Sequence, residues 1–545
     1  MSKLLIINLK RFGDIYSSAH TISAIKRNNP NTEVSMLVYS EFKKAATNIG
    51  GVENIYTLDR KKISAILNNK IYSNAFALEE LKDVMDRMIE LEFDEVFNYS
   101  NDYVSTNIVS YLSATVNMKV YGVSIRQNKS VQFSNEYALL FNDVLTELNN
   151  SPLHFQDCYT RIFGTHCSPA NNSVITSVKH NESAATNINF IKTANPDKKI
   201  IAIQLKTSTP SKDIPYLVLR NLIALVKEND NYFPLLLIAP FDEERTFSRK
   251  LNKEFGESLV IVEADLNAAA SVLANCDLLV GADTVIKHIA DNSATKVIEI
   301  SLGTSPFLKQ GPYSNGNLVL TDVIDKRSFT KKDHEATNFC SRITAESIFS
   351  TIAYTLQGEE LNLPKGLSLY QATNDDFGMR YKIVAGEVPW SHELDRLVTR
   401  EWISLKLSEQ SIQSIYEEVS NIPNREIKMW AARNKDLISH IMKDLLATLR
   451  ALAKIKSGGK SSLMFVNTLD KLLQRCGTAG SVSIALLIFR AKIENIQQSD
   501  FISSTVKFES LLFNLKTDLI QYLGIITKVE AAPVIDIRPA SQASL

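Results

Sequence analysis

The sequence lacks the features of a zinc protein, a disulfide-stabilised secreted protein or a membrane protein. Its five cysteines are widely spaced and none forms a CxxC pair, so we expect neither a zinc site nor a redox site. The longest apolar runs, FPLLLIAPF and VSIALLIF, are far shorter than the roughly 20 residues that span a membrane. The run near the N-terminus, LLIINL, is too short for the core of a signal peptide. We therefore expect a cytoplasmic protein with reduced thiols.

The sequence also lacks a net charge. Sixty basic and sixty acidic residues give a formal net charge of zero, so nothing in the global balance suggests a nucleic-acid partner. At 545 residues the chain is too long for one hydrophobic core of ordinary size. We therefore expect two or three domains.

Several motifs that would identify a cofactor or a metal are absent. No GxGxxG follows a strand-like run, SGGKS is only a fragment of a phosphate-binding P-loop, and neither DxD nor HExxH occurs. These absences argue against the standard dinucleotide site, against a metal-dependent sugar-nucleotide site of the DxD kind and against a zinc protease. We expect no cofactor and no metal.

Short apolar runs alternate with helical segments over most of the chain. The first half begins with LLIINL and EVSMLVY, and the pattern restarts after the polar stretch 169–198 with KIIAIQL, FPLLLIAP, DLLVGAD and TKVIEIS. Strand-like runs separated by helices indicate βαβ units around parallel sheets. The fold class is therefore α/β, with two Rossmann-like halves.

The character of the sequence changes after about residue 360. GLSLYQATNDDFGMRYKIVAG predicts a hairpin that turns at NDDFG, and all three tryptophans lie between 390 and 430. Residues 435–455 carry apolar side chains at helical spacing, which must be buried in their own core or against a partner. The predicted segments are an N-terminal Rossmann-like domain over 1–185 and a second one over 196–357. A hairpin-containing connector follows over 360–390, then a helical extension over 391–530 and a mobile tail over 531–545.

Polar residues that suit ligand chemistry follow the predicted strands. In open α/β sheets, ligands bind beyond the carboxyl ends of the strands, where helix N-termini also favour phosphate. Each of these residues has an ordinary structural interpretation as well. Asp14 and Asp283 could be helix caps, His288 could be a core histidine, and Lys212 could be a solvated lysine. Their recurrence at one edge of the sheets favours a site, with Asp14, Thr207, Ser208, Lys212, Glu243, Asp283, Thr284 and His288 as its candidate residues.

Two stretches of the sequence resemble glycosyltransferase family 9, the bacterial ADP-heptose:lipopolysaccharide heptosyltransferases. They are INLKRFGDIYSSAHTISAIKRNNPNTEVSMLVYSEFKKAATNIGGVENIYTLD and VGADTVIKHIADNSATKVIEISLGTSPFLKQGPY, and the resemblance extends over roughly residues 1–357. It implies a GT-B fold, in which two Rossmann-like domains face a cleft. It also implies inverting, metal-independent transfer of a heptose-like sugar from a nucleotide sugar, with ADP as the expected nucleotide.

The resemblance assigns a role to each candidate residue. Asp14 matches the acid expected to deprotonate the acceptor hydroxyl. Thr207, Ser208 and Lys212 match positions that hold the diphosphate, and Asp283, Thr284 and His288 match a D-T-G-x-x-H donor motif. A Glu at 243 or 244 would bind the ribose, and Arg60, Lys61 and Lys62 would meet an acidic acceptor. For those three residues, a solvated basic loop is an equally good interpretation.

Two departures from the family pattern keep alternatives open. Val285 stands where the family has a glycine, and the helical extension is an addition. The protein could instead be a catalytically lapsed relative that acts as a sugar-nucleotide-binding or glycan-binding scaffold, or a non-glycosyl α/β enzyme. The expected partners are a glycan, lipopolysaccharide-core or protein acceptor, the inner face of the membrane by peripheral contact, and a protein partner or a second copy bound through 391–530.

Overall fold

A computed structural model describes most of the chain, and its residues group into two compact units. The first unit comprises 1–125, 154–374 and 378–388, and the second comprises 126–153, 375–377 and 389–545. The described residues are 2–69, 74–126, 129–146, 148, 150–166, 174, 178–293, 295–302, 305, 307–322, 342–361, 363–458, 462–477, 482–496 and 501–532. Most of the predicted tail, together with Cys167 and Cys340, lies outside them.

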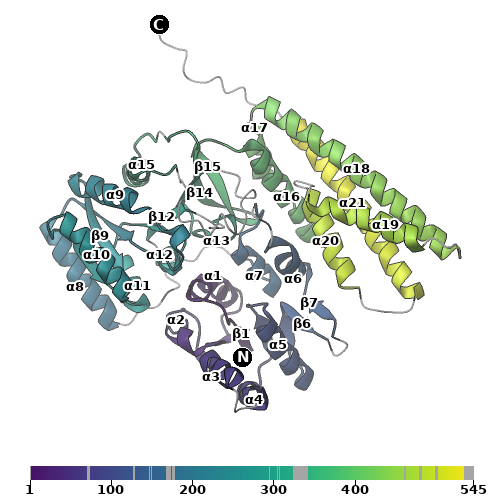
Figure 1. The fold of residues 1–545 in the computed structure, drawn as a ribbon, viewed down its shortest axis with the longest axis horizontal. Helices are drawn as coiled ribbons and strands as arrows, with labels where there is room; N and C mark the ends of the chain where they lie inside the picture. Colours follow the sequence, from purple (N-terminus) through teal and green to yellow (C-terminus); the bar gives the residue numbers. More distant parts are fainter. Residues whose placement is uncertain are drawn as a thin grey trace, which may run out of the picture. The chain divides into compact units, whose positions relative to one another are not determined.

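The N-terminal half of the first unit is a five-stranded parallel sheet in the order β3-β2-β1-β4-β5. Figure 1 draws β1 among the helices of this half. Its central strand β1 is buried on both faces apart from its first residue, which explains the apolar run LLII. The strands and their helices are β1 (Lys3–Ile7), α1 (Phe12–Asn28), β2 (Glu33–Tyr39), β3 (Asn54–Leu58), α3 (Arg60–Asn68), α4 (Asn74–Glu90), β4 (Glu95–Asn98), α5 (Tyr103–Thr115) and β5 (Lys119–Tyr121).

The stretch MKVYGVSI (118–125) forms two short strands, β5 and β6 (Val123–Ile125). Gly122 between them has a φ of +93°, and a β-carbon there would lie 2.7 Å from the carbonyl oxygen of Asn98. Only glycine tolerates both conditions, so the backbone turns at this point.

The C-terminal half of the first unit is an eight-stranded sheet in the order β10-β9-β8-β11-β12-β13-β14-β15. The pairs from β10 to β13 are parallel, whereas β14 is antiparallel to β13. Its elements are α8 (Val178–Ala194), β8 (Lys199–Gln204), α9 (Tyr216–Glu228), β9 (Tyr232–Ile238), α10 (Asp242–Glu254), β10 (Val260–Glu263), α11 (Leu266–Leu273), β11 (Leu278–Ala282), α12 (Val285–Asn292), β12 (Lys296–Ser301), α13 (Phe307–Gln310), β13 (Leu318–Asp322), α15 (Ala345–Gln357), β14 (Leu367–Asp375) and β15 (Gly378–Gly386).

The predicted hairpin is present, but it is more than a connector. Strand β14 pairs with β13 from Leu318 opposite Gln371 to Asp322 opposite Leu367, so the hairpin extends the sheet of the second half. The alternating pattern of a hairpin does not reveal which edge the hairpin joins, because that depends on an apolar strand far away in the sequence. The predicted domain boundaries remain predictions.

The two halves of the first unit meet through α1 and α12. His20 of α1 and Asp291 of α12 form a contact of 3.1 Å between ring Nε2 and carboxylate, and each side chain is 1% exposed. Burial raises the pKa of Asp291, but the hydrogen bond and the charge of His20 outweigh it and lower this pKa to about 2. Asn292 adds a hydrogen bond from its amide nitrogen to the carbonyl oxygen of Tyr16 at 3.3 Å. These buried polar contacts fix the register of the two helices.

The second unit is mainly helical, as the sequence predicts. Its long helices are α16 (Trp390–Ser408), α17 (Gln413–Ser420), α18 (Asn424–Lys456), α19 (Ser462–Gln474), α20 (Ser483–Glu494) and α21 (Phe501–Glu530). Trp402 stacks on Tyr522 with ring centroids 4.9 Å apart, in the core between α16 and α21. The predicted helix 435–455 is the second part of α18, which begins at Asn424 directly after Pro423.

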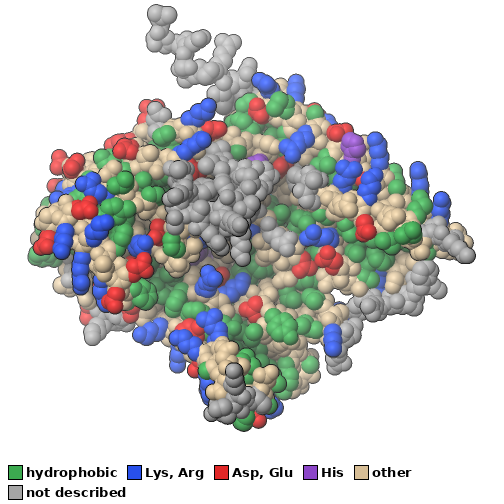
Figure 2. Space-filling view, in the orientation of Figure 1, with side chains coloured by type: hydrophobic (Ala, Val, Ile, Leu, Met, Phe, Trp, Pro, Cys, Tyr) green, Lys and Arg blue, Asp and Glu red, His purple; other side chains and the backbone are tan. Residues whose placement is uncertain are grey.

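Two global expectations can be compared with the described residues. Figure 2 shows basic and acidic side chains interspersed over the face that it draws, in keeping with a net charge of zero. No described helix has the length and the apolar character that crossing a bilayer requires. Among the described residues, Cys158, Cys276 and Cys476 are buried thiols that form no disulfide.

Candidate active site

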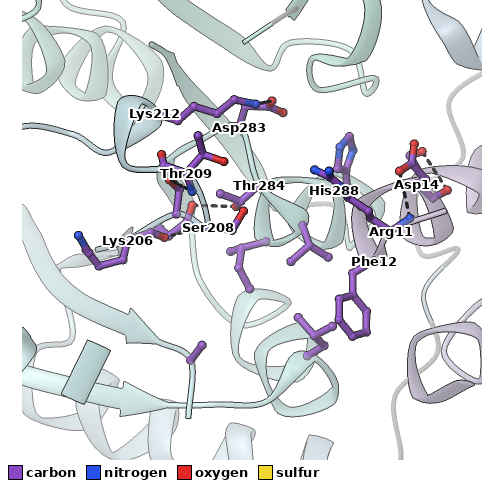
Figure 3. Close-up of a pocket in the computed structure, with 18 of the residues that line it drawn as sticks. Arg11, Phe12, Asp14, Lys206, Ser208, Thr209, Lys212, Asp283, Thr284 and His288 are labelled. Carbon is purple, nitrogen blue, oxygen red and sulfur yellow. Dashed lines mark hydrogen bonds and ion pairs between the residues drawn. The ribbon is translucent and has the colours of Figure 1, made fainter. Parts of the chain in front are cut away.

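A cleft of about 960 Å³ lies at the carboxyl ends of β1, β8, β9, β10 and β11 in the first unit. The site rule for open α/β sheets predicts a ligand at this edge. The cleft is lined by all the predicted catalytic and donor-binding residues, Asp14, Thr207, Ser208, Lys212, Glu243, Asp283, Thr284 and His288. Figure 3 shows most of these side chains around the same space.

Asp14 lies in the first turn of α1 and is not its N-cap. The N-cap residue is Arg11, and one carboxylate oxygen of Asp14 accepts a hydrogen bond from the Arg11 backbone N–H at 3.3 Å. The preceding Gly13 lets α1 come close to α12, because a β-carbon there would lie 3.3 Å from the ring carbon Cδ2 of His288. The Gly-Asp pair therefore places Asp14 beside the donor motif.

Asp283 bridges two lysines instead of capping α12. One of its oxygens accepts from Lys212 Nζ at 2.7 Å, and the other accepts from Lys287 Nζ at 2.7 Å. Burial raises the pKa of the Asp283 carboxyl, but the charges of Lys287 and Lys212 outweigh it and hold the pKa well below its usual range. Asp283 is therefore ionised, and it holds Lys212 at the wall of the cleft.

Lys287 lies beneath the cleft in a buried ionic network. Its ammonium lies 3.1 Å from Glu299 of β12 and donates to the carbonyl oxygen of Gln310 at 2.7 Å. The side chains of Lys287 and Glu299 are 1% and 0% exposed. Burial lowers the pKa of Lys287, but the charges of Asp283 and Glu299 outweigh burial. The net effect is a pKa above the usual value, so the lysine stays charged. Burial raises the pKa of Glu299 above its usual value, and Lys287 only partly opposes this.

Two signals in the sequence point to this network, although strand ends alone do not reveal it. Asp283 and Lys287 are four residues apart, the spacing of a helical ion pair. Glu299 is a charged residue inside the buried strand KVIEIS, where charge needs a partner.

The start of α12 lines the cleft. Thr284 is the N-cap residue by position, but its hydroxyl donates to Gln204 Oε1 at 3.0 Å; within the described part of the chain it makes no capping hydrogen bond. Val285 and Ile286, the first two helical residues, line the cleft. The next cleft residue on this helix is His288, whose pKa is lowered to about 3 by burial and by the charge of Lys287. Its imidazole is therefore neutral at pH 7.

The loop after β8 is shaped by Asp213, which is not among the predicted site residues. Asp213 accepts from the backbone N–H of Thr207 at 2.7 Å and from its hydroxyl at 2.8 Å. The same carboxylate accepts from Lys206 Nζ at 2.6 Å. Ser208, at the tip of this loop, is exposed. The loop therefore adds Lys206 to the cationic groups of the cleft.

Glu243 and Glu244, the two glutamates predicted to bind the ribose, differ in orientation. Glu244 accepts from the backbone N–H of Ala239 at 2.9 Å and so fixes the loop between β9 and α10. The Glu243 side chain is 82% exposed and lies 3.7 Å from Lys206 Nζ. Of the two carboxylates, Glu243 is the one available to a ligand hydroxyl.

The predicted acceptor residues do not line the cleft. Arg60, Lys61 and Lys62 form the first turn of α3, which Asp59 caps by accepting from the Lys62 backbone N–H at 2.9 Å. The guanidinium of Arg60 lies 4.7 Å from the ring centre of Tyr39. It also lies 5.9 Å from the ring centre of Phe42, which is a cleft residue. An acceptor role for these three residues remains a prediction.

One wall of the cleft comes from α7 (Phe155–Phe163) and was not expected. His154, Gln156 and Tyr159 line it. His154 Nε2 lies 3.1 Å from the carbonyl oxygen of Gly311, and burial lowers the pKa of this histidine to about 3. No strand ends directly before these residues, so reasoning from strand ends could not find them.

The cleft can now be compared with known proteins. Residues 133–337 match the family model of glycosyltransferase family 9 (heptosyltransferase). The chain resembles glycosyltransferase family 9. The match covers less than half of the chain, and no curated protein matches it in sequence. Among solved structures, the glycosyl transferase family 9 protein from Veillonella parvula is 14% identical with a TM-score of 0.50, over 66% of this chain and 98% of that one.

A second neighbour is weaker. E. coli ADP-heptose lipopolysaccharide heptosyltransferase II is 15% identical with a TM-score of 0.47, over 66% of this chain and 100% of that one. The likeness to the Veillonella protein shows the fold, and the family match supports a glycosyltransferase. The predicted family resemblance and the predicted α/β fold with a helical C-terminal region are confirmed.

Proposed function

We propose that the protein is an inverting, metal-independent glycosyltransferase that transfers a heptose-like sugar from a nucleoside-diphosphate donor, with ADP as the expected nucleotide, to a hydroxyl of a glycan or lipopolysaccharide-core acceptor. The observation that carries the proposal is the meeting of Asp14 and the Lys212–Asp283–Thr284 group in one cleft. Figure 3 draws Asp14 on one side of His288, and Lys212 and Asp283 on the other. A base and an anion site at the two ends of one space are what sugar transfer requires.

In the proposed reaction, the acceptor hydroxyl oxygen attacks the anomeric carbon of the donor sugar. The new carbon–oxygen bond forms as the bond from the anomeric carbon to the phosphate oxygen breaks. The Asp14 carboxylate takes the proton of the hydroxyl, and the nucleoside diphosphate leaves with the electron pair. One displacement inverts the configuration at the anomeric carbon.

The charge of the leaving diphosphate would be met by donors of this chain. Lys212 lies at the cleft wall, Lys206 is close to it on the same loop, and the N-terminus of α12 begins at Val285. Ammonium groups and helix N-termini both stabilise phosphate oxygens. Asp283 positions Lys212 in the absence of ligand, and the network with Lys287 keeps that carboxylate charged.

Replacing the proposed base tests the assignment. Asp14→Asn should keep ADP affinity and lower turnover by about 10²–10⁴-fold. Isothermal titration gives the affinity, and release of ADP in the presence of acceptor gives the turnover. The control is Asp102→Asn, because Asp102 caps α5 without lining the cleft. If Asp14→Asn turns over as fast as this control, the Asp14 carboxylate only supports the start of α1 by accepting from the Arg11 backbone N–H.

A second function is favoured by one residue. Val285 lines the cleft at the start of α12, where the family pattern has a glycine. A branched side chain there would crowd a bound donor, and a protein of this kind would bind nucleotide without transferring sugar. ADP binding by the unmodified protein, with no transfer to any hydroxyl acceptor, would favour this scaffold function.

A further inference from the structure

Helix α21 carries apolar side chains on two opposite faces. One face is buried in the second unit and includes Leu512, Leu515, Leu519 and Tyr522. The opposite face exposes Val506, Phe513 and Ile520, which are 53%, 50% and 53% exposed. Packing within the second unit explains why the first face is apolar. It does not explain why the second face is apolar.

The exposed residues form a straight line. Val506, Phe513 and Ile520 are seven residues apart, which is two helical turns, so they lie along one side of α21 over about 21 Å. Exposed Ser510, Thr517 and Gly524 repeat at the same interval beside them, and a β-carbon added to Gly524 would meet open space. We call these six residues the α21 stripe. Large residues next to small ones at a seven-residue period are typical of a helix that packs against another helix.

Exposure of this kind differs from ordinary surface apolarity. Single exposed apolar residues are common on soluble proteins, whereas a continuous row marks an interface. Figure 2 shows hydrophobic side chains among those that the helical unit exposes on the face drawn. The exposed row on α21 is therefore expected to be covered by a binding partner.

The charges beside the stripe fit a second copy of the same helix. Glu509 and Lys516 flank the stripe on the same side, four residues before and three residues after Phe513. In an antiparallel pair centred on Phe513, Val506 lies opposite Ile520 of the second copy, and Glu509 lies one residue, about 1.5 Å along the axis, from the level of the second copy's Lys516. A two-fold axis repeats both contacts. In a parallel pair, Glu509 would meet Asn514 and Lys516 would meet Gln521, so no charges would pair.

We propose that two copies of this chain associate through the α21 stripe, with their α21 helices antiparallel about Phe513. The stripe is narrow and has an acid beside it, which suits another helix better than a lipid surface. Within the chain, Glu509 already accepts from Lys456 Nζ at 2.7 Å, and a carboxylate can accept from two lysines. The proposal is independent of the sugar-transfer function.

The mass of the full-length protein in solution tests the proposal. Sedimentation at about 1–100 µM should show a dimer. Phe513→Lys should weaken association at least about 10-fold, because it places two ammonium groups at the two-fold axis. Phe190→Lys is the control, since Phe190 of α8 is 77% exposed but belongs to another helix. It should leave the dimer unchanged.

Charge exchange tests the antiparallel arrangement. Lys516→Glu alone should weaken association, and Glu509→Lys with Lys516→Glu should restore part of it, because the exchanged pair is complementary between the two copies although the pair with Lys456 is lost. Phe513→Cys should give a disulfide-linked dimer under mild oxidation, whereas Phe190→Cys should not. The proposal is overturned by an unmodified protein that stays monomeric, by a dimer that survives Phe513→Lys, or by a monomer that binds anionic phospholipid vesicles through the stripe.

Discussion

Replacing Lys287 by methionine removes an ammonium group buried beneath the cleft while keeping a side chain of similar length. The ammonium of Lys287 lies 2.7 Å from Asp283 and 3.1 Å from Glu299. Without it, Glu299 loses the only ion-pair partner found for it among the described residues, in a place where its side chain is 0% exposed. Asp283 keeps Lys212 at 2.7 Å. The damage should therefore fall mainly on Glu299.

The loss of stability in Lys287→Met depends on how deeply Glu299 is buried. Breaking a buried ion pair by removing one partner costs about 3–5 kcal/mol, because a charge is left buried without compensation. Glu299 can relieve part of this by binding a proton, since burial already raises its pKa. We expect Lys287→Met to lower the free energy of unfolding by about 3 kcal/mol at pH 7.

The pH dependence separates this cause from a simple packing defect. In the variant, Glu299 has a higher pKa in the folded protein than in the unfolded chain, so the folded state binds more protons. The difference in stability between the variant and the unmodified protein should therefore shrink as the pH falls from 7 to 5. Urea unfolding at both pH values measures it. Lys287→Met combined with Glu299→Gln is the control, and it should recover part of the loss at pH 7. A loss under 1 kcal/mol, or one that is equal at both pH values, would refute the reasoning.

Three further predictions concern the cleft and its surroundings. Val285→Gly should tighten ADP-sugar binding or broaden the range of sugars accepted, at a cost of about 1 kcal/mol in helix stability; unchanged or weaker binding in calorimetry would mean that the backbone has adapted to valine. The pKa values of His154 and His288 are about 3 in the folded protein and near 6.5 in the unfolded chain, so below pH 6.5 the unfolded chain binds protons that the folded protein does not. The free energy of unfolding should therefore be highest above pH 6.5 and fall by about 2 kcal/mol for each histidine at pH 5. Urea unfolding at pH 7 and 5 checks this, and His154→Gln should flatten the dependence. Replacing residues 60–62 with alanine should raise the KM of an anionic acceptor and weaken its salt dependence without changing donor binding; an unchanged KM would indicate a neutral acceptor.

The sequence alone predicts those parts of the site that depend on strand ends. Asp14, Lys212, Asp283 and Thr284 each follow an apolar run, and the carboxyl ends of parallel strands meet at one edge. The alternation of apolar runs and helices was sufficient to place the two parallel sheets. Both predictions rest on local patterns, and this is why they could be made without a structure.

The remaining features depend on contacts between distant parts of the chain. Asp213 shapes the loop at Thr207, His154 meets Gly311, and strand β14 joins β13. A local pattern does not specify which partner a buried group finds elsewhere. The Asp283–Lys287 pair differs from these contacts, because its four-residue spacing can be read from the sequence. Its burial cannot be read from the sequence.

Isothermal titration with ADP and with adenosine tests the donor site most directly. If Lys212 and the start of α12 hold the diphosphate, the unmodified protein binds ADP more tightly than adenosine. Lys212→Ala should then weaken ADP binding by roughly 10- to 150-fold, as expected for a charge-assisted hydrogen bond of about 1.5–3 kcal/mol, with little effect on adenosine. Equal losses for both ligands would place Lys212 away from the phosphates, and no binding of ADP by the unmodified protein would contradict the proposed donor site.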